Sequence, residues 1–221
     1  MKKIVILLVC LLAASSLFAV DITVGGALGF SHSWMSGSDW DDMLKDEDLS
    51  NEFRLGFEIG GFADIAINKM FSVQPELNFL YMRVGGGGIE NLGIKTEYGI
   101  TYSTKVLEIP VLAKFNFAAG HGKLSAFLGP AVQFILGDIA TDVTMSVSGI
   151  SISLPGNSLE PDNSVIFAGV VGAGYAMPIG PGSLCFDLRY RRQFNGLFDN
   201  INYRLNTIGL RVGYGIGLKL K

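Results

Sequence analysis

Apolar and polar residues alternate at period two along most of the chain, and the clearest case is the stretch 105–137. In its first arm Leu107 and Ile109 fall on one side and Glu108 falls on the other. A short turn near residues 118–123 leads into a second arm with the same alternation. Such a pattern is typical of a β-hairpin whose two faces meet different environments.

Eight segments alternate in this way or are apolar enough to form a strand, and each is long enough to cross a bilayer when tilted. They are 21–34, 52–67, 71–84, 100–117, 124–136, 165–177, 184–194 and 203–220. The connections between them alternate in length. The long ones are 35–51, 85–99, 140–164 and 195–202, and the short ones are 68–70, 118–123 and 178–182. This predicts an all-β fold, an eight-stranded antiparallel up-and-down transmembrane β-barrel with four longer external loops and three short periplasmic turns.

Three features favour a barrel with its apolar face turned outward to lipid. The segment 165–177 has no polar face, each strand carries few ionisable groups, and those groups nearly balance in sign. A closed lumen needs such balance because an unpaired buried charge is costly. We predict a structural charge network in the lumen, formed by Arg54, Glu58, Glu76, Glu108, Lys114, Asp187, Arg189, Arg191 and Arg211. The alternative is a secreted soluble β-protein that carries these charges on its surface.

An eight-stranded ring is just filled by its own side chains, so an open pore is not expected. Prolines within three strands each remove a donor from the ladder, and we expect bulges or strand distortions there. They are Pro75, Pro110 and Pro130. Aromatic residues near strand ends predict interfacial girdles, with Trp34 and Tyr203 on the external side.

Composition agrees with this class of fold. The chain has 221 residues, enough for one domain, with 17% charged and 49% hydrophobic residues and 29 glycines. The formal net charge of -3 shows no excess of basic residues that could bind a polyanion, so nucleic acid is not expected as a partner. After the amino terminus no apolar run is long enough for a transmembrane helix, so strands must account for the mean hydropathy of +0.39.

The first 19 residues predict a secretory signal peptide, which leaves a barrel domain over 20–221. Lys2 and Lys3 form the basic start, an apolar run follows, and Ala19 suits the cleavage site. Leu17 is bulky for its position, so an uncleaved anchor is the alternative. A lipoprotein reading of Cys10 is less favoured, because this cysteine lies inside the apolar run. Cys185 would then be the one mature cysteine, which excludes an intrachain disulfide.

No residue set predicts catalysis, a cofactor or a metal site. His32 lies between Ser31 and Ser33, where a lipid-modifying enzyme would place a catalytic group, but no carboxylate stands at a suitable spacing. The acidic segment 39–48 is interpreted as a solvated external loop rather than a Ca²⁺ site, because it lacks the ordered D-x-D-x-D-G pattern. The run Gly85–Gly88 is interpreted as a flexible loop.

The loop 140–164 alternates apolar and polar residues around Ser148-Gly149. It is expected to extend the strands 124–136 and 165–177 as a protruding ribbon that could pair with the edge strand of another chain. Loops 35–51 and 140–164 are the expected contacts for an external partner.

Four motifs carry a resemblance to a known family. Gln74-Pro75-Glu76-Leu77, Leu107-Glu108-Ile109-Pro110, Gly129-Pro130 and Asp187-Leu188-Arg189-Tyr190 resemble the PorT-like outer-membrane β-barrel family, small barrels related to the OmpA/OmpX type. The resemblance covers nearly the whole mature chain and implies that Glu76, Glu108, Lys114, Asp187 and Arg189 line the lumen. The sequence departs from many outer-membrane barrels by ending in Leu-Lys-Leu-Lys instead of an aromatic residue.

The function expected from these features is that of a non-enzymatic, integral outer-membrane barrel with a side-chain-filled lumen. Its role would be structural in the envelope or binding through the loops, as in adhesion. The alternatives are a narrow channel for small solutes and, less favoured, a lipid-modifying enzyme. Outer-membrane lipid and the barrel assembly machinery are the expected partners.

Overall fold

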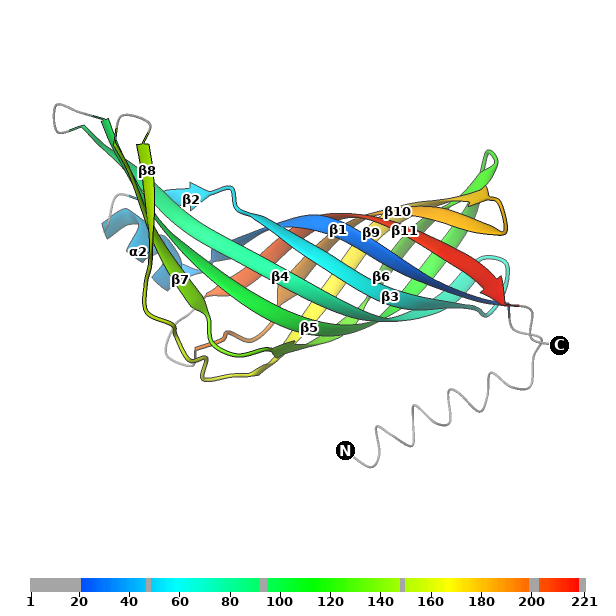
Figure 1. Cartoon of the computed structure of the whole chain (residues 1–221). Helices are drawn as coiled ribbons and strands as arrows, with labels where there is room; N and C mark the ends of the chain where they lie inside the picture. The colour runs from blue at the N-terminus through cyan, green and yellow to red at the C-terminus, as the bar shows by residue number, and fades with distance from the viewer. Residues whose placement is uncertain (1–20, 47–48, 92–94, 148–149, 199–202, 219–221) are drawn as a thin grey trace.

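A computed structural model describes residues 21–46, 49–91, 95–147, 150–198 and 203–218. Eight antiparallel strands form a ring that closes through the pairing of β4 with β5 and of β1 with β11. The strands are β1 (Ile22–Ser36), β3 (Leu55–Ala66), β4 (Phe71–Asn91), β5 (Lys95–Ala119), β6 (Gly122–Ile135), β9 (Val165–Ile179), β10 (Gly182–Gln193) and β11 (Arg204–Leu218). The predicted eight-stranded ring is therefore confirmed (Figure 1).

The strands of the ring are staggered. A path along paired residues from Ile22 on β1 around all eight strands returns to β1 at His32, ten residues further along the chain. Such a stagger tilts the strands against the barrel axis and closes the sheet without a free edge inside the ring. Within the described residues, no helix is long and apolar enough to cross a membrane.

One end of the barrel is built up by further elements, and we call it the extended end. There the short strand β2 (Ser50–Glu52) pairs with β4, while β7 (Ala140–Val147) pairs with β5 and with β8 (Ile150–Pro155). Helix α2 (Ser38–Asp46) lies at the same end (Figure 1). At the opposite, short-turn end, the connections are residues 67–70, 120–121 and 180–181.

The glycine run Gly85–Gly88 was expected to be a flexible loop, and this is wrong, because it lies inside β4. Neighbouring side chains lie against both faces of the strand here. A Cβ on Gly86 would stand 3.0 Å from Leu44 Cδ2 of α2, and a Cβ on Gly87 would collide with the Glu52 carboxylate. Glycine is needed because other elements occupy the space of its missing side chain. The long loop predicted over 85–99 is accordingly two paired strand ends.

The ribbon predicted in loop 140–164 exists, but its pairing differs from the expectation. The strands β7 and β8 form a hairpin. It adds to the part of β5 nearest the extended end, from Thr96 to Ser103, instead of prolonging β6 and β9. The reason is the length of β5, which reaches well beyond β6 and offers an unpaired edge. A sheet edge without a partner favours the addition of a strand.

The prolines produce no bulge. The register between β4 and β5 is the same at Pro75–Val111 and at Asn78–Glu108, with a lapse in pairing between them. The ladder of β5 and β6 lapses in the same way around Pro130 without a shift in register. Bulges are therefore absent at these sites. Each proline lies at a local interruption of a ladder, which for Pro75 is the ladder of β3 and β4, and this is the strand distortion expected as the alternative.

The two faces of the sheet meet opposite surroundings. Apolar side chains in the middle of the strands point outward and are between 45% and 66% exposed, for example Leu28, Phe57, Leu128, Leu188 and Leu210. Charged side chains point inward and are at most 4% exposed, for example Glu58, Glu76, Glu108, Arg189 and Arg211. This inverted distribution is the one expected when hydrocarbon surrounds the ring.

A charge on this outer belt should destabilise the barrel according to its depth. We expect Leu210→Arg, in the middle of β11, to lower the free energy of unfolding by about 2–4 kcal/mol, and Leu218→Arg, at the strand end, by about 0–1 kcal/mol. Urea titrations of the protein folded in lipid vesicles measure both values. Equal effects at the two positions would contradict an outer surface that faces lipid.

Candidate functional site

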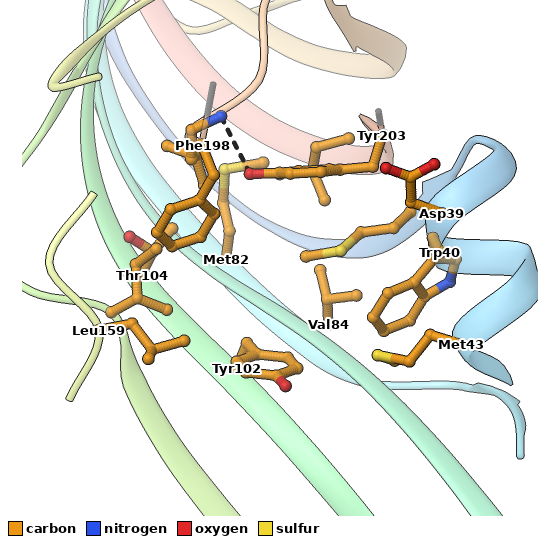
Figure 2. A pocket seen from close by; sticks show the side chains of 14 residues that line it. Asp39, Trp40, Met43, Met82, Val84, Tyr102, Thr104, Leu159, Phe198 and Tyr203 are labelled. Carbon is orange, nitrogen blue, oxygen red and sulfur yellow. Dashed lines mark hydrogen bonds between the residues drawn. The ribbon is translucent and has the colours of Figure 1, made fainter. Parts of the chain in front are cut away.

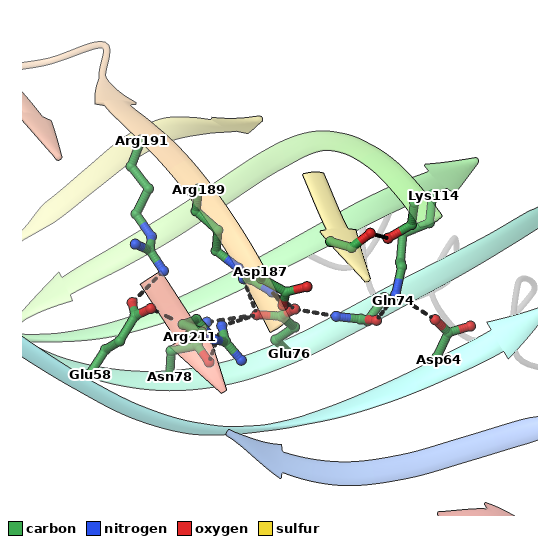
Figure 3. A network of polar contacts seen from close by, with 12 residues as sticks. Glu58, Asp64, Gln74, Glu76, Asn78, Lys114, Asp187, Arg189, Arg191 and Arg211 are labelled. Atoms are coloured by element: carbon green, nitrogen blue, oxygen red, sulfur yellow. Dashed lines mark hydrogen bonds and ion pairs between the residues drawn. The ribbon is translucent and has the colours of Figure 1, made fainter. Parts of the chain in front are cut away.

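The lumen is crossed by ion pairs between strands on opposite sides of the ring. Strand β10 stands opposite β4, four places away in either direction around the barrel. Arg189 on β10 nevertheless reaches Glu76 on β4, with Nη1 2.7 Å from Oε2 and Nη2 2.9 Å from Oε1. This fork geometry is the strongest form of a charge-assisted hydrogen bond, and both side chains are fully buried. The pair therefore spans the central section of the lumen (Figure 3).

Glu76 is the most highly coordinated group of this network. Its Oε2 also accepts hydrogen bonds from Arg211 Nη1 at 2.9 Å and from Asn78 Nδ2 at 2.9 Å. Gln74 donates to the other oxygen. One carboxylate thus neutralises part of the charge of two arginines, and it does so with both of its oxygens satisfied.

A second set of contacts lies beside the first, towards the extended end. Arg191 Nη2 is 2.5 Å from Glu58 Oε2, and Arg191 Nε is 3.1 Å from Glu108 Oε1. Gln133 Nε2 donates to the other oxygen of Glu108 at 2.8 Å, and Gln193 donates to Gln133 Oε1 at 2.7 Å. Three arginines and three glutamates from five strands are thus joined in one buried cluster, to which Arg211 also belongs through an ion pair with Glu58 at 3.7 Å.

Two more of the predicted lumen residues lie at the periphery of this cluster. Asp187 Oδ2 accepts a hydrogen bond from Arg189 Nη2 at 2.8 Å. Lys114 Nζ is 2.8 Å from Asp64 Oδ2 and 2.7 Å from Gln74 Oε1. Gln74 therefore links the Lys114–Asp64 pair to Glu76, so the polar contacts are continuous along the lumen (Figure 3). Asp64, Gln74, Asn78 and Gln133 were not predicted as site residues, although the alternation places them on the charged face.

Arg54 was predicted in the lumen, and this is wrong. Its guanidinium pairs with Glu52 and covers Gly85 and Gly99, on the face of the β4–β5 sheet that points away from the lumen. Residues 53–54 lie between β2 and β3 and outside either strand, so the alternation that holds for β3 does not extend to them. The predicted inward position of Arg54 assumed an unbroken strand.

One wall of the lumen is apolar. Leu112, Phe127, Ala131, Ala168 and Val170 form a buried cluster on β5, β6 and β9. Arg189 lies over the Phe127 ring, 5.1 Å from its centroid, so this wall also supports the charge network through a cation–π contact. The ring has room because Gly172 faces it, where a Cβ would stand 2.5 Å from Phe127 Cζ. This explains why the segment 165–177 has no polar face.

The extended end is closed by helix α2, in the segment that was expected to be a solvated loop. Trp40, Met43 and Leu44 follow the spacing of one helical face, and Trp40 and Leu44 are buried. The helix begins with acidic Asp39 and Asp41 and ends with Lys45, which suits its dipole. The expectation of a solvated loop is corrected: Asp41 and Asp42 are exposed on the outer side of a helix whose other side packs into the mouth, Asp39 borders the pocket beneath the helix, and Glu47 and Asp48 lie outside the described residues. Among the described residues, no group of three His, Cys, Asp or Glu could hold a metal ion.

A pocket lies between helix α2 and the strands that surround it at the extended end. The cavity measures about 150 Å³ and has mostly apolar walls from α2, β1, β4, β5 and β11, completed by Ile139, Leu159, Leu197, Phe198 and Tyr203 (Figure 2). Tyr203, which was expected in an interfacial girdle, lines this pocket and is only 3% exposed. Its hydroxyl accepts a hydrogen bond from the Leu197 amide at 2.9 Å, and burial raises the pKa of Tyr203 to about 12.

His32 lies apart from both the lumen and the pocket. Its ring stacks on Phe53 at 4.5 Å and on Trp34 at 5.7 Å, and its Nδ1 is 3.3 Å from the Arg54 carbonyl oxygen. The neighbouring Ser33 points to the other face of β1, where it contacts Thr207 Oγ1 at 2.9 Å. The structure thus does not bring His32 together with a serine. The signal peptide, its cleavage at Ala19 and Cys10 lie outside the described residues.

A closed eight-stranded ring with an apolar outside and a charged inside defines an integral outer-membrane β-barrel protein. The family model described as "Outer membrane protein beta-barrel domain" matches residues 14–202, and the chain belongs to this family. The protein is therefore located in the bacterial outer membrane, as predicted, and the soluble alternative is set aside. No curated protein matches the sequence significantly.

Several solved outer-membrane proteins are similar to this chain at low identity. OprG from Pseudomonas aeruginosa matches with 10% identity and a TM-score of 0.48, over 91% of this chain and 97% of OprG. The attachment invasion locus protein Ail of Yersinia pestis, in complex with sucrose octasulfate, matches with 15% identity and a TM-score of 0.38, over 90% of this chain and 100% of Ail. A major outer membrane protein from Thermus thermophilus matches with 11% identity and a TM-score of 0.42, over 91% of this chain and 100% of that protein.

Removing the charge at the centre of the network should be costly. Glu76→Gln keeps the size of the side chain but leaves Arg189 and Arg211 without their shared counter-charge, and we expect a loss of about 3–5 kcal/mol in the free energy of unfolding. Asp64→Asn is the matched control, because Asp64 belongs to a partly exposed pair; its expected loss is about 1 kcal/mol or less. Urea titrations in lipid vesicles compare the two. A loss for Asp64→Asn as large as that for Glu76→Gln would contradict the central position of Glu76.

Proposed function

We propose that this protein is a closed barrel that conducts no solute and acts through its extended end, as an envelope component or by binding a partner, as in adhesion. The observation that carries this proposal is the contact of Arg189 with Glu76 across the full width of the lumen. A second barrier supports it, because Trp40 and Leu44 of α2 are buried in the mouth. A solute would have to break a buried ion pair and then displace a packed helix.

The proposal also covers the orientation of the barrel in the membrane and the removal of a signal peptide. The extended end faces the exterior, the short-turn end faces the periplasm, and residues 1–19 are removed at Ala19 to leave the barrel domain 20–221. The exposed apolar belt is the surface that outer-membrane lipid would cover, and the barrel assembly machinery would insert it. The four motifs quoted above support membership of the PorT-like group within the wider family. The net charge of -3 argues against nucleic acid as a partner.

The loops 35–51 and 140–164 are the proposed contacts for an external partner, and the second offers the clearer surface. Strand β8 ends the order of strands in the sheet, and all its residues are exposed. Apolar side chains of β7 and β8 stand opposite one another on one face of the hairpin, as the pairs Val143–Leu154, Met145–Ile152 and Val147–Ile150. An extended segment of a partner protein could add to this edge and cover that face.

The alternative of a lipid-modifying enzyme has little support. His32 is the residue that such an activity would use, and its ring is held between Trp34 and Phe53. Its Nδ1 faces a backbone carbonyl oxygen, whereas catalysis of this kind needs a carboxylate to orient the ring. We therefore propose a role without enzymatic activity.

Conductance separates a closed barrel from the alternative of a narrow solute channel. We expect the purified protein to give no steady current in planar bilayers, and the same silence after α2 is replaced by a flexible linker, because the charge network still spans the lumen. Truncation of Glu76 and Arg189 to alanine should open a path and serves as the conducting control. Heat-modifiable migration in gels verifies that each variant is folded. Steady conductance of the unmodified protein would refute the proposal.

Site-specific photo-crosslinking tests the partner surface. A photoreactive phenylalanine at Ile152 on β8 should give a discrete adduct with a second protein in native outer membranes, because its side chain lies on the exposed face of the hairpin. The same group at Leu210 should give no protein adduct, since that side chain faces lipid. The absence of an adduct at Ile152, or the same adduct at both positions, would count against binding at this edge.

A further inference from the structure

The outer face of the neighbouring strands β4 and β5 changes from apolar to basic where the lipid-facing belt meets the extended end (Figure 1). On β4, the outward-facing Tyr81 is followed two residues later by Arg83. On β5, which runs in the opposite direction, Lys105 precedes Leu107. The alternation of buried and open positions along both strands places these side chains on the outer face. Lys105 stands opposite Tyr81 in the ladder, so Arg83 is its diagonal neighbour, about 7–8 Å away and within reach of a long side chain.

Neither of these two cations has a carboxylate partner among the described residues. Arg54, further along the same face, pairs with Glu52. Arg83 and Lys105 instead form no side-chain hydrogen bond or ion pair with any residue that the structure describes. Asp142 on β7 points to the same side of the sheet, but β5 separates it from Arg83, and it contacts neither cation. Two positive charges are therefore left together at the border of an apolar surface.

The ends of both side chains are accessible to a ligand. Nε of Arg83 is buried against the sheet, but its two terminal nitrogens are neither buried nor bonded to a described residue. Lys105 is exposed, and its ammonium group has three donors that can rotate. A guanidinium fork matches two oxygens of a phosphate, and a lysine beside it binds phosphate as a point charge. The pair thus has the chemistry of a phosphate site.

An apolar surface continues from this pair towards the middle of the membrane. Leu107 and Ile109 follow Lys105 on β5, where Ile109 is 40% exposed, and Leu77 on β4 is 53% exposed. Acyl chains can lie along these side chains while the headgroup stands at the level of the two cations. Long basic side chains at the end of a lipid-facing surface extend towards the headgroups, and clusters of them bind anionic ones. A soluble anion would use the charges but not the apolar surface beside them, so a lipid fits the whole site.

We propose that Arg83 and Lys105 bind the phosphate of a phosphomonoester lipid in the outer leaflet, with the acyl chains of that lipid lying on the outer face of β4 and β5. A phosphomonoester carries about −1.5 to −2 charges at neutral pH, which two cations balance, whereas a phosphodiester has a single ionisable oxygen. This inference deepens the proposed function and rests on it, because the external orientation of the extended end places the pair in the outer leaflet.

Native mass spectrometry of the protein folded in detergent measures the binding of single lipid molecules. Phosphatidic acid, phosphatidylglycerol and phosphatidylcholine with the same acyl chains serve as probes, because they present a phosphomonoester, an anionic phosphodiester and a zwitterionic headgroup. The first molecule of phosphatidic acid is expected to bind more tightly than either of the others. A large excess of inorganic phosphate should leave this binding intact, since the free anion lacks the chains that hold the lipid on the apolar surface.

Substitutions that remove one charge each identify the site. Arg83→Gln and Lys105→Gln should each weaken phosphatidic acid about fivefold and leave phosphatidylcholine unchanged. The double variant should lose the preference for phosphatidic acid. Arg192→Gln is the matched control, because Arg192 is also outward and exposed near the same end of the belt but lies on β10, opposite β4 in the ring. It should change neither affinity, and heat-modifiable migration verifies the fold of every variant.

Each result decides one part of the inference. Equal losses from Arg192→Gln and Arg83→Gln mean that any basic side chain at this level attracts the lipid, and they overturn the site. Displacement by inorganic phosphate overturns the lipid as the occupant, and equal affinity for phosphatidic acid and phosphatidylglycerol overturns the preference for a phosphomonoester. Conductance by the unmodified barrel contradicts closure and leaves these affinities as they are, whereas a silent barrel with unselective lipid binding contradicts this inference alone.

Discussion

The structure depends on the ion pair that Arg189 makes with Glu76 across the lumen. In a soluble protein, the burial of apolar side chains drives the formation of the core. Here the apolar side chains face outward, and lipid is as favourable an environment for them as a protein interior. The interior must therefore be specified by other means. A buried carboxylate that contacts two arginines can be satisfied only when β4, β10 and β11 stand in their correct positions, because either partner left unpaired would be a buried charge.

The balance of charges follows from the same constraint. The central cluster joins Glu58, Glu76 and Glu108 with Arg189, Arg191 and Arg211, so its formal charges cancel. The side-chain amides of Gln74, Asn78 and Gln133 add hydrogen bonds to Glu76 and Glu108, and the apolar wall of β5, β6 and β9 lies against Arg189. The interior of the barrel is thus built around charges that cancel one another across the lumen.

The extended end is built on a different principle, that of an ordinary hydrophobic core. Trp40 and Leu44 of α2 pack with Val84, Tyr203 and Leu205 over the top of the charge network. The long strands β4 and β5 carry this core beyond the ring, and the edges they would expose are covered by β2 on one side and by β7 on the other. The barrel thus combines a polar interior within the membrane and an apolar one above it, and the pocket lies in the upper part, where side chains of the two connections meet the helix.

The sequence determined the ring of strands, because the period-two alternation reflects lipid on one side of a strand and a mostly polar lumen on the other; the segment 165–177, which faces the apolar wall, was recognised by its apolar character instead. It also determined which charges point inward wherever a strand is unbroken, as for Glu76, Glu108 and Arg189. It could not determine what depends on contacts between distant segments. Arg54 left the lumen because the chain departs from the strand at residues 53–54, and Gly85–Gly88 is a strand because Leu44 and Glu52 take the place of its side chains. The helical spacing of Trp40, Met43 and Leu44 was present in the sequence, but only the folded barrel provides the apolar mouth that such a short helix needs in order to be stable.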